Sequence, residues 1–360
     1  MSRPTSPWVA CLIVLAVEPA TGQQVAEIDF EAGRTIITNE WRAMDPYLMD
    51  ADWSRGLLYI GDSEEPNGIM VFSLATGQRI QTIATPKGEG PYEFPYRRRG
   101  MALGPHGGLY VSGFQRIVEF DMAGEPVSSW TPHAPPSPVV CSFGGAPAVV
   151  TQGGVVRRTA DGRGNTIGAV RSDGEAISPR GNESPVVTAM RLREARIACT
   201  EERAYVVLSY DMGPDSVFVY DRADEIGRIV LPTEGLDGMM DCRPWRYVSQ
   251  PPEEHCLVGL HKLTPSFDGR GNLVLFGFDE QIHGAIIDPE TGCHTLVRNT
   301  TRFAHMPVRV HADSVLVFHN DVEQRAGGRA TYWDTATAAS LHPLRRVGGE
   351  VCPGMLLSVG

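Results

Sequence analysis

Residues 100–127 read GMALGPHGGLYVSGFQRIVEFDMAGEPV, and this stretch decides the fold. A glycine-rich turn at 104–108 precedes the apolar run LYV, and a second apolar run, VEF, leads into the turn DMAGE. Turns of glycine and polar residues between short apolar runs are the sequence signal of β-hairpins. The stretch therefore predicts antiparallel strands that are joined by tight turns.

The same two-part pattern recurs along the chain. Ten-residue windows of a turn followed by an apolar run begin at Ala51, Leu103, Cys141, Cys199, Phe267 and Arg309. Their starts lie about 52 residues apart on average, a period typical of repeat architectures. The second element, an apolar run followed by a polar residue and a turn, appears in every unit except the third. There VVRRTADGRG (residues 155–164) places arginines in the run.

Six such units predict an all-β fold, a six-bladed β-propeller with four-stranded antiparallel blades. A β-sandwich does not require six copies, and a β-helix has much shorter repeats. Residues 26–40 contain the β-branched run RTIIT, so we expect this N-terminal strand to pair with the last blade and close the ring. The tail at 341–360 is the competing candidate for this role.

The segment between the first two units, KGEGPYEFPYRRRG (residues 87–100), is predicted to return the chain from the rim to the central axis. It contains neither of the glycine-rich phosphate-loop patterns and does not open a helix. Residues 88–95 and the stretch after them resemble the NHL-type repeat of bacterial exported six-bladed propellers, whose linker reads G-x-G-P-G-E-F. The sequence departs from that pattern at Tyr92 and Gly113, and the close match covers about residues 85–130. The resemblance implies the propeller fold and a binding or scaffolding role, without implying a reaction.

The N-terminus has the features of an export signal. One arginine precedes the apolar run WVACLIVLAV (residues 8–17), and small residues follow up to Gly22. We therefore expect residues 1–22 to be a signal peptide and the mature protein to be periplasmic or extracellular; a buried N-terminal strand is the alternative. Residues 23–360 are then a single propeller domain with an insertion at about 231–258.

Six cysteines remain after the signal, and an even number in an exported chain permits disulfides. No C-x-x-C pattern is present, so a zinc site is not expected. Cys242 and Cys256 are close in sequence and are the first candidate pair. The alternative is that some of the cysteines are small buried apolar residues.

The charge of the chain limits its partners. The formal net charge is −11, which argues against nucleic acid as the main partner, because nucleic-acid binding depends on a basic surface. After signal removal, no segment is expected to insert into a membrane. We expect a monomer without a cofactor.

Basic residues nevertheless precede several of the innermost predicted strands, where the blades converge. Because arginine presents a planar fork that grips carboxylate, sulfate or phosphate, these residues predict a site for a small anionic ligand, a protein or a surface polymer. The alternative is that they pair with glutamates between blades or face solvent. The predicted ligand-binding residues are Arg97, Arg98, Arg99, Arg191, Arg193, His261, Arg302 and His305, and the same search also points to Arg309.

No catalytic residues are predicted. Some six-bladed propellers are metal-dependent lactonases or lyases whose axial metal is held by several acidic or histidine side chains. In this chain Asp50 and His261 are the best available ligands, and two are too few for a closed oxygen site. The preferred function is therefore non-catalytic binding or scaffolding, and a metal-dependent lactonase-like or lyase-like enzyme is the alternative.

Overall fold

The computed structural model describes somewhat under three fifths of the chain, in many short ranges. They are residues 24–29, 31–38, 46–62, 68–96, 98–132, 139–151, 154–160, 163–168, 171–172, 175–176, 195–207, 216–221, 225–230, 240–241, 257–258, 264–276, 282–298, 306–319 and 338–347. The predicted signal peptide lies outside these ranges, as do most of the predicted insertion and the candidate pair Cys242 and Cys256.

The described residues form an all-β structure, apart from one short 3-10 turn at Pro105–Gly107. Within them, no helix has the length and apolar character needed to cross a membrane. Four of the sheets have four strands each, and all their pairings are antiparallel.

The four-stranded sheets follow one another along the chain. The first holds β3 (Pro46–Asp52), β4 (Leu57–Asp62), β5 (Gly68–Ser73) and β6 (Arg79–Ala84). The second holds β7 (Gly100–Leu103), β8 (Leu109–Ser112), β9 (Ile117–Phe120) and β10 (Pro126–Trp130). The third holds β11 (Val140–Phe143), β12 (Ala146–Thr151), β13 (Gly154–Arg158) and β14 (Gly164–Gly168). The fourth holds β17 (Arg196–Cys199), β18 (Ala204–Val207), β19 (Ser216–Tyr220) and β20 (Glu225–Val230).

A nine-stranded sheet brings the two ends of the described chain together. Its C-terminal strands are β23 (Thr264–Phe267), β24 (Leu273–Phe276), β25 (Ile282–Ile287), β26 (His294–Arg298), β27 (Met306–His311), β28 (Ser314–His319) and β29 (Ala338–Val347). Two N-terminal strands join them, β1 (Gln24–Ile28) and β2 (Arg34–Thr38). β1 lies between β26 and β29, and β2 pairs with the first half of β29.

Two further pairs of short strands lie outside these sheets. β15 (Arg171–Ser172) pairs with β16 (Glu175–Ala176), and β21 (Met240–Asp241) pairs with β22 (Leu257–Val258).

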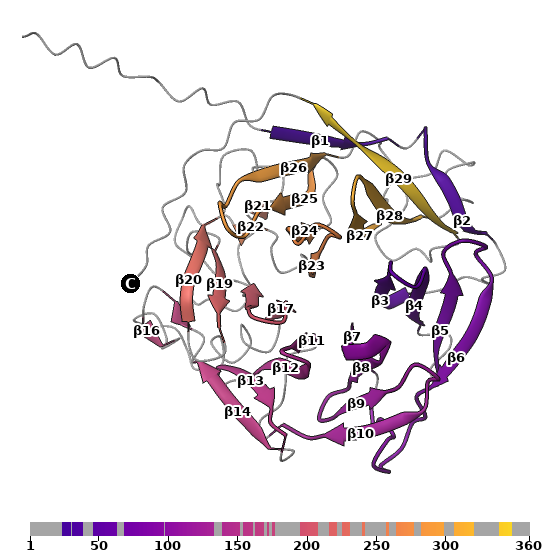
Figure 1. Cartoon of the computed structure of the whole chain (residues 1–360), viewed down its shortest axis with the longest axis vertical. Helices are drawn as coiled ribbons and strands as arrows, with labels where there is room; N and C mark the ends of the chain where they lie inside the picture. The colour runs from indigo at the N-terminus through magenta and orange to yellow at the C-terminus, as the bar shows by residue number, and fades with distance from the viewer. Residues whose placement is uncertain are drawn as a thin grey trace, which may run out of the picture.

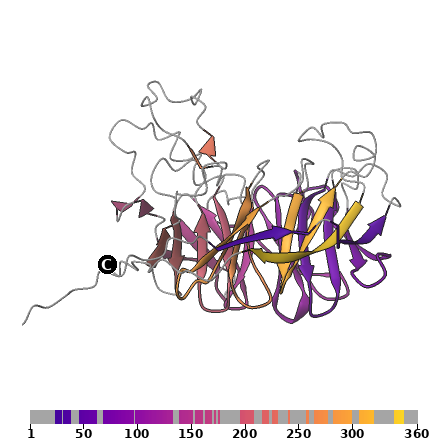
Figure 2. The same ribbon diagram turned by 90° about the horizontal axis from the view of Figure 1, so that it is seen from above.

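The sheets are arranged radially, as in a β-propeller. Strands β3, β7, β11, β17, β23 and β27 lie nearest the centre, while strands such as β6, β10 and β14 lie at the rim (Figure 1). Seen from the side, the body is a disc whose strands run between its two faces (Figure 2). The prediction of an all-β propeller built from four-stranded antiparallel sheets is confirmed.

The hydrophobic core lies between neighbouring sheets. Successive residues of a strand face opposite sides, so an apolar run covers both faces of a sheet. Leu58 on β4 packs in a cluster with Leu316 on β28, whereas the next residue, Tyr59, packs in a cluster with Leu109 and Val111 on β8. Each sheet is therefore covered on both sides by its neighbours.

The linker between β6 and β7 takes its shape from close packing around Glu93. The Glu93 carboxylate accepts a hydrogen bond of 2.8 Å from the backbone N–H of Gly90. A Cβ on Gly88 would lie 2.0 Å from the carboxylate of Glu93, so the first glycine leaves room for the acid. Phe94 is then buried in the cluster between the first two sheets. The predicted crossing from rim to axis is confirmed.

A disulfide joins the third and fourth sheets. It links Cys141 on β11 to Cys199 on β17, with 5.6 Å between their Cα atoms. Cys293 is also disulfide-bonded. Disulfides persist in oxidising compartments, so this bond favours such a location. The Cys141–Cys199 pairing was not predicted, and the pair Cys242–Cys256 stays a prediction because it lies outside the described residues.

Replacing both Cys141 and Cys199 with serine is expected to destabilise the fold. The bond closes a loop across a sequence separation of 58 residues, so its loss should lower the free energy of unfolding by about 2–4 kcal/mol. Urea unfolding followed by circular dichroism, with and without reductant, measures this change. An identical midpoint for the oxidised wild type and the double variant would contradict it.

His294 makes the stability depend on pH. It is buried at the start of β26, and this burial lowers the pKa of its imidazole below the usual value of 6.5. As the pH falls, the unfolded chain takes up the proton first, so stability present above about pH 6.5 is lost as the pH falls through the folded pKa. The decline in unfolding free energy from about pH 7 to pH 5 should be shallower in His294→Gln. The same substitution at the exposed His106 is the control, and an equal change there would contradict the assignment.

Candidate functional site

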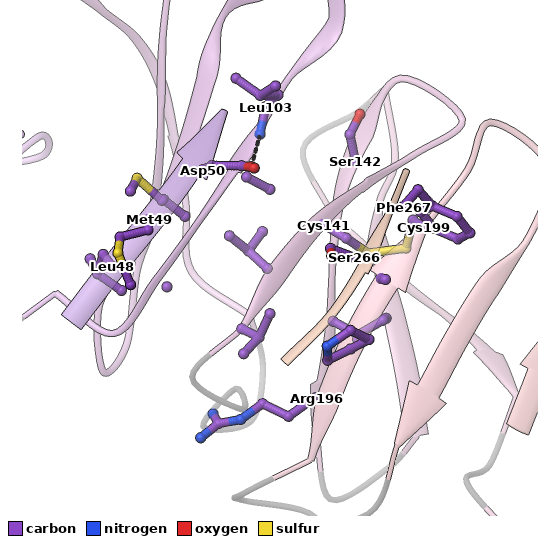
Figure 3. Close-up of a pocket in the computed structure, with 18 of the residues that line it drawn as sticks. Leu48, Met49, Asp50, Leu103, Cys141, Ser142, Arg196, Cys199, Ser266 and Phe267 are labelled. Atoms are coloured by element: carbon purple, nitrogen blue, oxygen red, sulfur yellow. Dashed lines mark hydrogen bonds between the residues drawn. A yellow bond between two sulfur atoms is a disulfide. The ribbon is translucent and has the colours of Figure 1, made fainter. Parts of the chain in front are cut away.

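The innermost strands enclose a cavity of about 360 Å³ at the centre of the ring. Each of the six strands nearest the centre contributes at least one residue to its lining, and Figure 3 labels residues from β3, β7, β11, β17 and β23. One representative from each, taken in chain order, gives Met49, Met101, Ser142, Arg196, Phe267 and Arg309. The cavity is thus a property of the whole ring and belongs to no single sheet.

The charged residues of the lining are mostly basic. Arg99 lies directly before β7, Arg196 is the first residue of β17, and Arg309 is on β27. The carboxylate of Asp50 on β3 is the single acid among the described lining residues. Three arginines therefore face one carboxylate in a chain whose net charge is −11.

Asp50 and Arg309 form a clasp that spans three sheets. The Nε of Arg309 lies 3.0 Å from Oδ1 of Asp50, and its Nη2 donates to the carbonyl of Met49 at 2.7 Å. The other oxygen of Asp50 accepts a hydrogen bond of 3.2 Å from the backbone N–H of Leu103, at the end of β7. The clasp connects β27 with the first and second sheets, and the charges of Asp50 and Arg309 compensate each other.

An aromatic ring lies beside Arg99. The guanidinium of Arg99 lies 5.4 Å from the ring centroid of Phe114, within the range of a cation–π contact. Phe114 in turn meets the exposed ring of Tyr96 edge to face, with 5.8 Å between centroids. These contacts hold Arg99 on the side of the cavity that belongs to the second sheet.

Arg196 lies at one end of the cavity. Figure 3 shows its side chain opposite the end that holds Asp50 and Leu103. Phe267 and the disulfide between Cys141 and Cys199 lie nearer to the end with Asp50 than to Arg196.

Aromatic side chains also contribute to the lining. Phe267 meets Tyr205 edge to face at 5.3 Å, and Trp53 stacks on His311 with 4.7 Å between ring centroids. Beside Phe267, the hydroxyl of Ser266 is buried and has no hydrogen-bond partner within the described part of the chain.

The turn that carries Trp53 is fixed by Asp52. This carboxylate accepts hydrogen bonds from the hydroxyl of Ser54 at 2.6 Å and from Nε of Arg55 at 2.6 Å. Burial alone would raise the pKa of Asp52, but these bonds lower it below its usual value. Arg55 also donates to the carbonyl of Gly107 at 2.8 Å, which ties the turn to the second sheet.

The predicted ligand-binding residues fall into two groups. Six lie outside the described residues, so their role stays a prediction: Arg97, Arg191, Arg193, His261, Arg302 and His305. Arg99 lines the cavity, as does Arg309 from the same search. Arg98 is 2% exposed, donates to Thr85 at 2.7 Å and to the carbonyl of Gly68, and is not among the residues that line the cavity.

Sequence reasoning missed Arg196, Trp53 and Ser266 as lining residues. Arg196 is the first residue of the strand RIAC, whose last residue, Cys199, begins the repeat window. For Arg196 the available signal was its place at the start of an inner strand, whereas Trp53 lies just after β3 and Ser266 lies inside β23, where no such signal exists. Within the described ranges, no group of three or more histidine, cysteine, aspartate or glutamate residues has the arrangement of a metal site.

The comparisons with known proteins return propellers of low similarity. No family model matches the sequence, and no curated protein matches it. A catalytically inactive virginiamycin B lyase from Staphylococcus aureus, solved with quinupristin, is 12% identical over 88% of each chain, with a TM-score of 0.45. The β-propeller domain of Cps50 (Swd1) from Myceliophteria thermophila is 11% identical over 87% of this chain and 90% of that one, with a TM-score of 0.48. The RRP9 WD40 repeats are 9% identical over 90% and 100%, also with a TM-score of 0.48. At these values the likenesses carry no argument about function.

The clasp between Asp50 and Arg309 should stabilise the fold in a cooperative way. The side chains are only 16% and 11% exposed, so Asp50→Asn or Arg309→Gln should each cost about 3 kcal/mol by leaving a buried charge unpaired. The double variant should cost less than the two single changes together, with a coupling energy above about 1 kcal/mol.

A double-mutant cycle in urea measures this coupling. The ion pair of Arg270 with Asp313 is the control, since its side chains are 45% and 63% exposed. Its coupling should stay below about 1 kcal/mol. Equal coupling energies in the two pairs would contradict the prediction that the buried clasp stabilises the fold more than an exposed ion pair does.

Proposed function

We propose that the chain is an exported, non-catalytic binding protein that holds an anionic ligand in the central cavity of a six-bladed β-propeller. The observation that carries this proposal is the charge of the lining. Three arginines face one carboxylate, and that carboxylate is already paired with Arg309. The described part of the lining thus holds more arginines than acids, and this excess supports an anionic ligand.

The blade count and the closure of the ring are supported by strand order. Strands β23 to β26 follow one another as a four-stranded path, and β27, β28, β29 and β2 make a second one. Together with the four separate sheets, this order supports a count of six blades. Because β2 comes before the first sheet in the chain, its pairing with β29 supports closure of the ring by an N-terminal strand.

Export is supported by the apolar run at residues 8–17 and by the disulfide between Cys141 and Cys199. The linker at 88–95, with its glycines packed against Glu93, supports the resemblance to NHL-type exported propellers. That resemblance favours a binding or scaffolding role.

The physics of the cavity favours a small anion as the ligand. An arginine guanidinium donates hydrogen bonds to carboxylate, sulfate or phosphate in a planar arrangement. Like charges inside a concave, low-dielectric site raise the local concentration of counter-ions. A volume of 360 Å³ is at the lower end of the range for small-molecule sites, which is about 300–1,000 Å³.

The alternative function is that of a metal-dependent lactonase-like or lyase-like enzyme. Such an enzyme would contain a bound metal ion, which the proposed binding protein does not need. Elemental analysis of the mature protein, purified without chelator, separates the two functions. A stoichiometric divalent metal would support the enzyme, and a protein that binds anions without metal supports the proposal.

Anion binding should depend on Arg99 and Arg196. Arg99→Gln and Arg196→Gln should each weaken the binding of sulfate or acetate roughly tenfold or more, as expected when a charge-assisted hydrogen bond is lost. Isothermal titration calorimetry at low ionic strength measures this change. Arg79→Gln is the matched control, since Arg79 is exposed on the rim strand β6. The proposal is wrong if the wild type binds neither anion, or if the control weakens binding as much as the two cavity variants.

A further inference from the structure

Ser266 is a buried residue in the wall of the central cavity whose hydrogen-bonding capacity is not used. It is 8% exposed, and its hydroxyl has no hydrogen-bond partner within the described part of the chain. Pro265 and Phe267 line the cavity with it, so β23 turns its edge toward the space. Figure 3 shows Ser266 and Phe267 on the side that also carries the disulfide between Cys141 and Cys199. A buried hydroxyl without a partner is unfavourable, so a ligand that supplies the missing bond is stabilised there.

The charged pair of the lining is already engaged within the protein. Asp50 accepts hydrogen bonds from Nε of Arg309 and from the backbone N–H of Leu103. Arg309 also donates to the carbonyl of Met49. The hydrogen bond that Ser266 offers is by contrast unmade, and a neutral group on a ligand can complete it without any change in charge.

The aromatic ring beside Ser266 is held in place from behind. Phe267 packs against the core cluster between the fourth and fifth sheets, which includes Ala198. Its ring meets the buried ring of Tyr205 edge to face, with 5.3 Å between the centroids. Aromatic pairs are favourable beyond the area that they bury. Phe267 therefore presents a preformed wall for an aromatic ring next to the hydroxyl of Ser266.

The rest of the wall limits the class of ligand. Ile197, Val140 and Met101 contribute apolar side chains from three different sheets. Two serines, Ser142 and Ser266, supply the hydroxyl groups of the described lining. A sugar carries a hydroxyl on almost every carbon, and beside apolar side chains most of these would lose their hydrogen bonds. An aromatic ring with one hydroxyl group fits this wall better.

We propose that the central cavity contains a neutral subsite for a hydroxylated aromatic ring, that is, for a phenol. The ring lies against Phe267, and its hydroxyl forms a hydrogen bond with the hydroxyl of Ser266. This inference goes beyond the proposed function, because it uses none of the charges of the cavity. An anionic ligand with a phenolic body would use both parts of the site.

Isothermal titration calorimetry of the mature chain with phenol and with toluene tests the subsite, because the two probes differ by a hydroxyl in place of a methyl group. An apolar cavity without a hydrogen-bond partner would prefer toluene, since water solvates the phenol hydroxyl. The wild type should instead bind phenol at least as tightly as toluene. Ser266→Ala should weaken phenol roughly tenfold and leave toluene unchanged.

Two further variants separate the hydroxyl from the ring. Ser142→Ala is the matched control, since Ser142 lines the same cavity from β11 and is only partly buried. It should change the ratio of the two affinities by less than about twofold, because water reaches a partly exposed hydroxyl. Phe267→Leu should weaken phenol and toluene by a similar factor, about threefold or more.

The ligand-free protein gives an independent measurement. Because the hydroxyl of Ser266 has no partner to lose, Ser266→Ala should not lower the temperature of thermal unfolding. A drop larger than that of Ser142→Ala would show that the hydroxyl has a structural role, and would overturn the inference.

The binding outcomes distinguish this inference from the proposed function. Phenol that does not bind, or binds equally well to Ser266→Ala, overturns the subsite, as does glucose that binds through Ser266 in place of phenol. Sulfate and acetate test the anion site separately. If phenol binds through Ser266 and neither anion binds, the subsite stands and the proposed function fails; if the anions bind and phenol does not, the reverse holds.

Discussion

The structure depends on one packing constraint, which is that each sheet is apolar on both faces. Leu58 and Tyr59 are adjacent on β4, yet they join core clusters with different neighbouring sheets. A sheet of this kind is stable only when a neighbour covers each face, and a closed ring provides two neighbours for every sheet. The pairing of β1 and β2 with β29 brings N-terminal and C-terminal strands of the described residues into one sheet.

The central cavity follows from that constraint, but its chemistry does not. Twisted sheets packed in a ring leave a space where the innermost strands converge, whatever side chains line it. In this chain Asp50 and Arg309 use the space to connect three sheets. Arg99 and Arg196 also line it, so the described lining residues include three arginines and one acid. This excess of arginine over acid in the described lining is the feature on which the proposed anionic ligand rests.

The sequence predicted the parts of this account that depend on local pattern. Alternating turns and apolar runs gave the sheets, and the glycines at 88 and 90 gave the linker, because a tight turn leaves its mark in adjacent residues. The side chains of Arg98 and Arg99 show where this fails, since neighbouring residues face opposite sides and no pattern reveals which one reaches the cavity. The bond between Cys141 and Cys199 was missed for a related reason: its partners meet only through the packing of two sheets.

A crystal structure of the mature protein grown with selenate tests the central claim most directly, because the anomalous signal of selenium locates the anion without ambiguity. The account predicts a selenium peak inside the central cavity, within hydrogen-bond distance of Arg99 or Arg196. Selenate bound only on the outer surface, with the cavity occupied by ordered water, would contradict it.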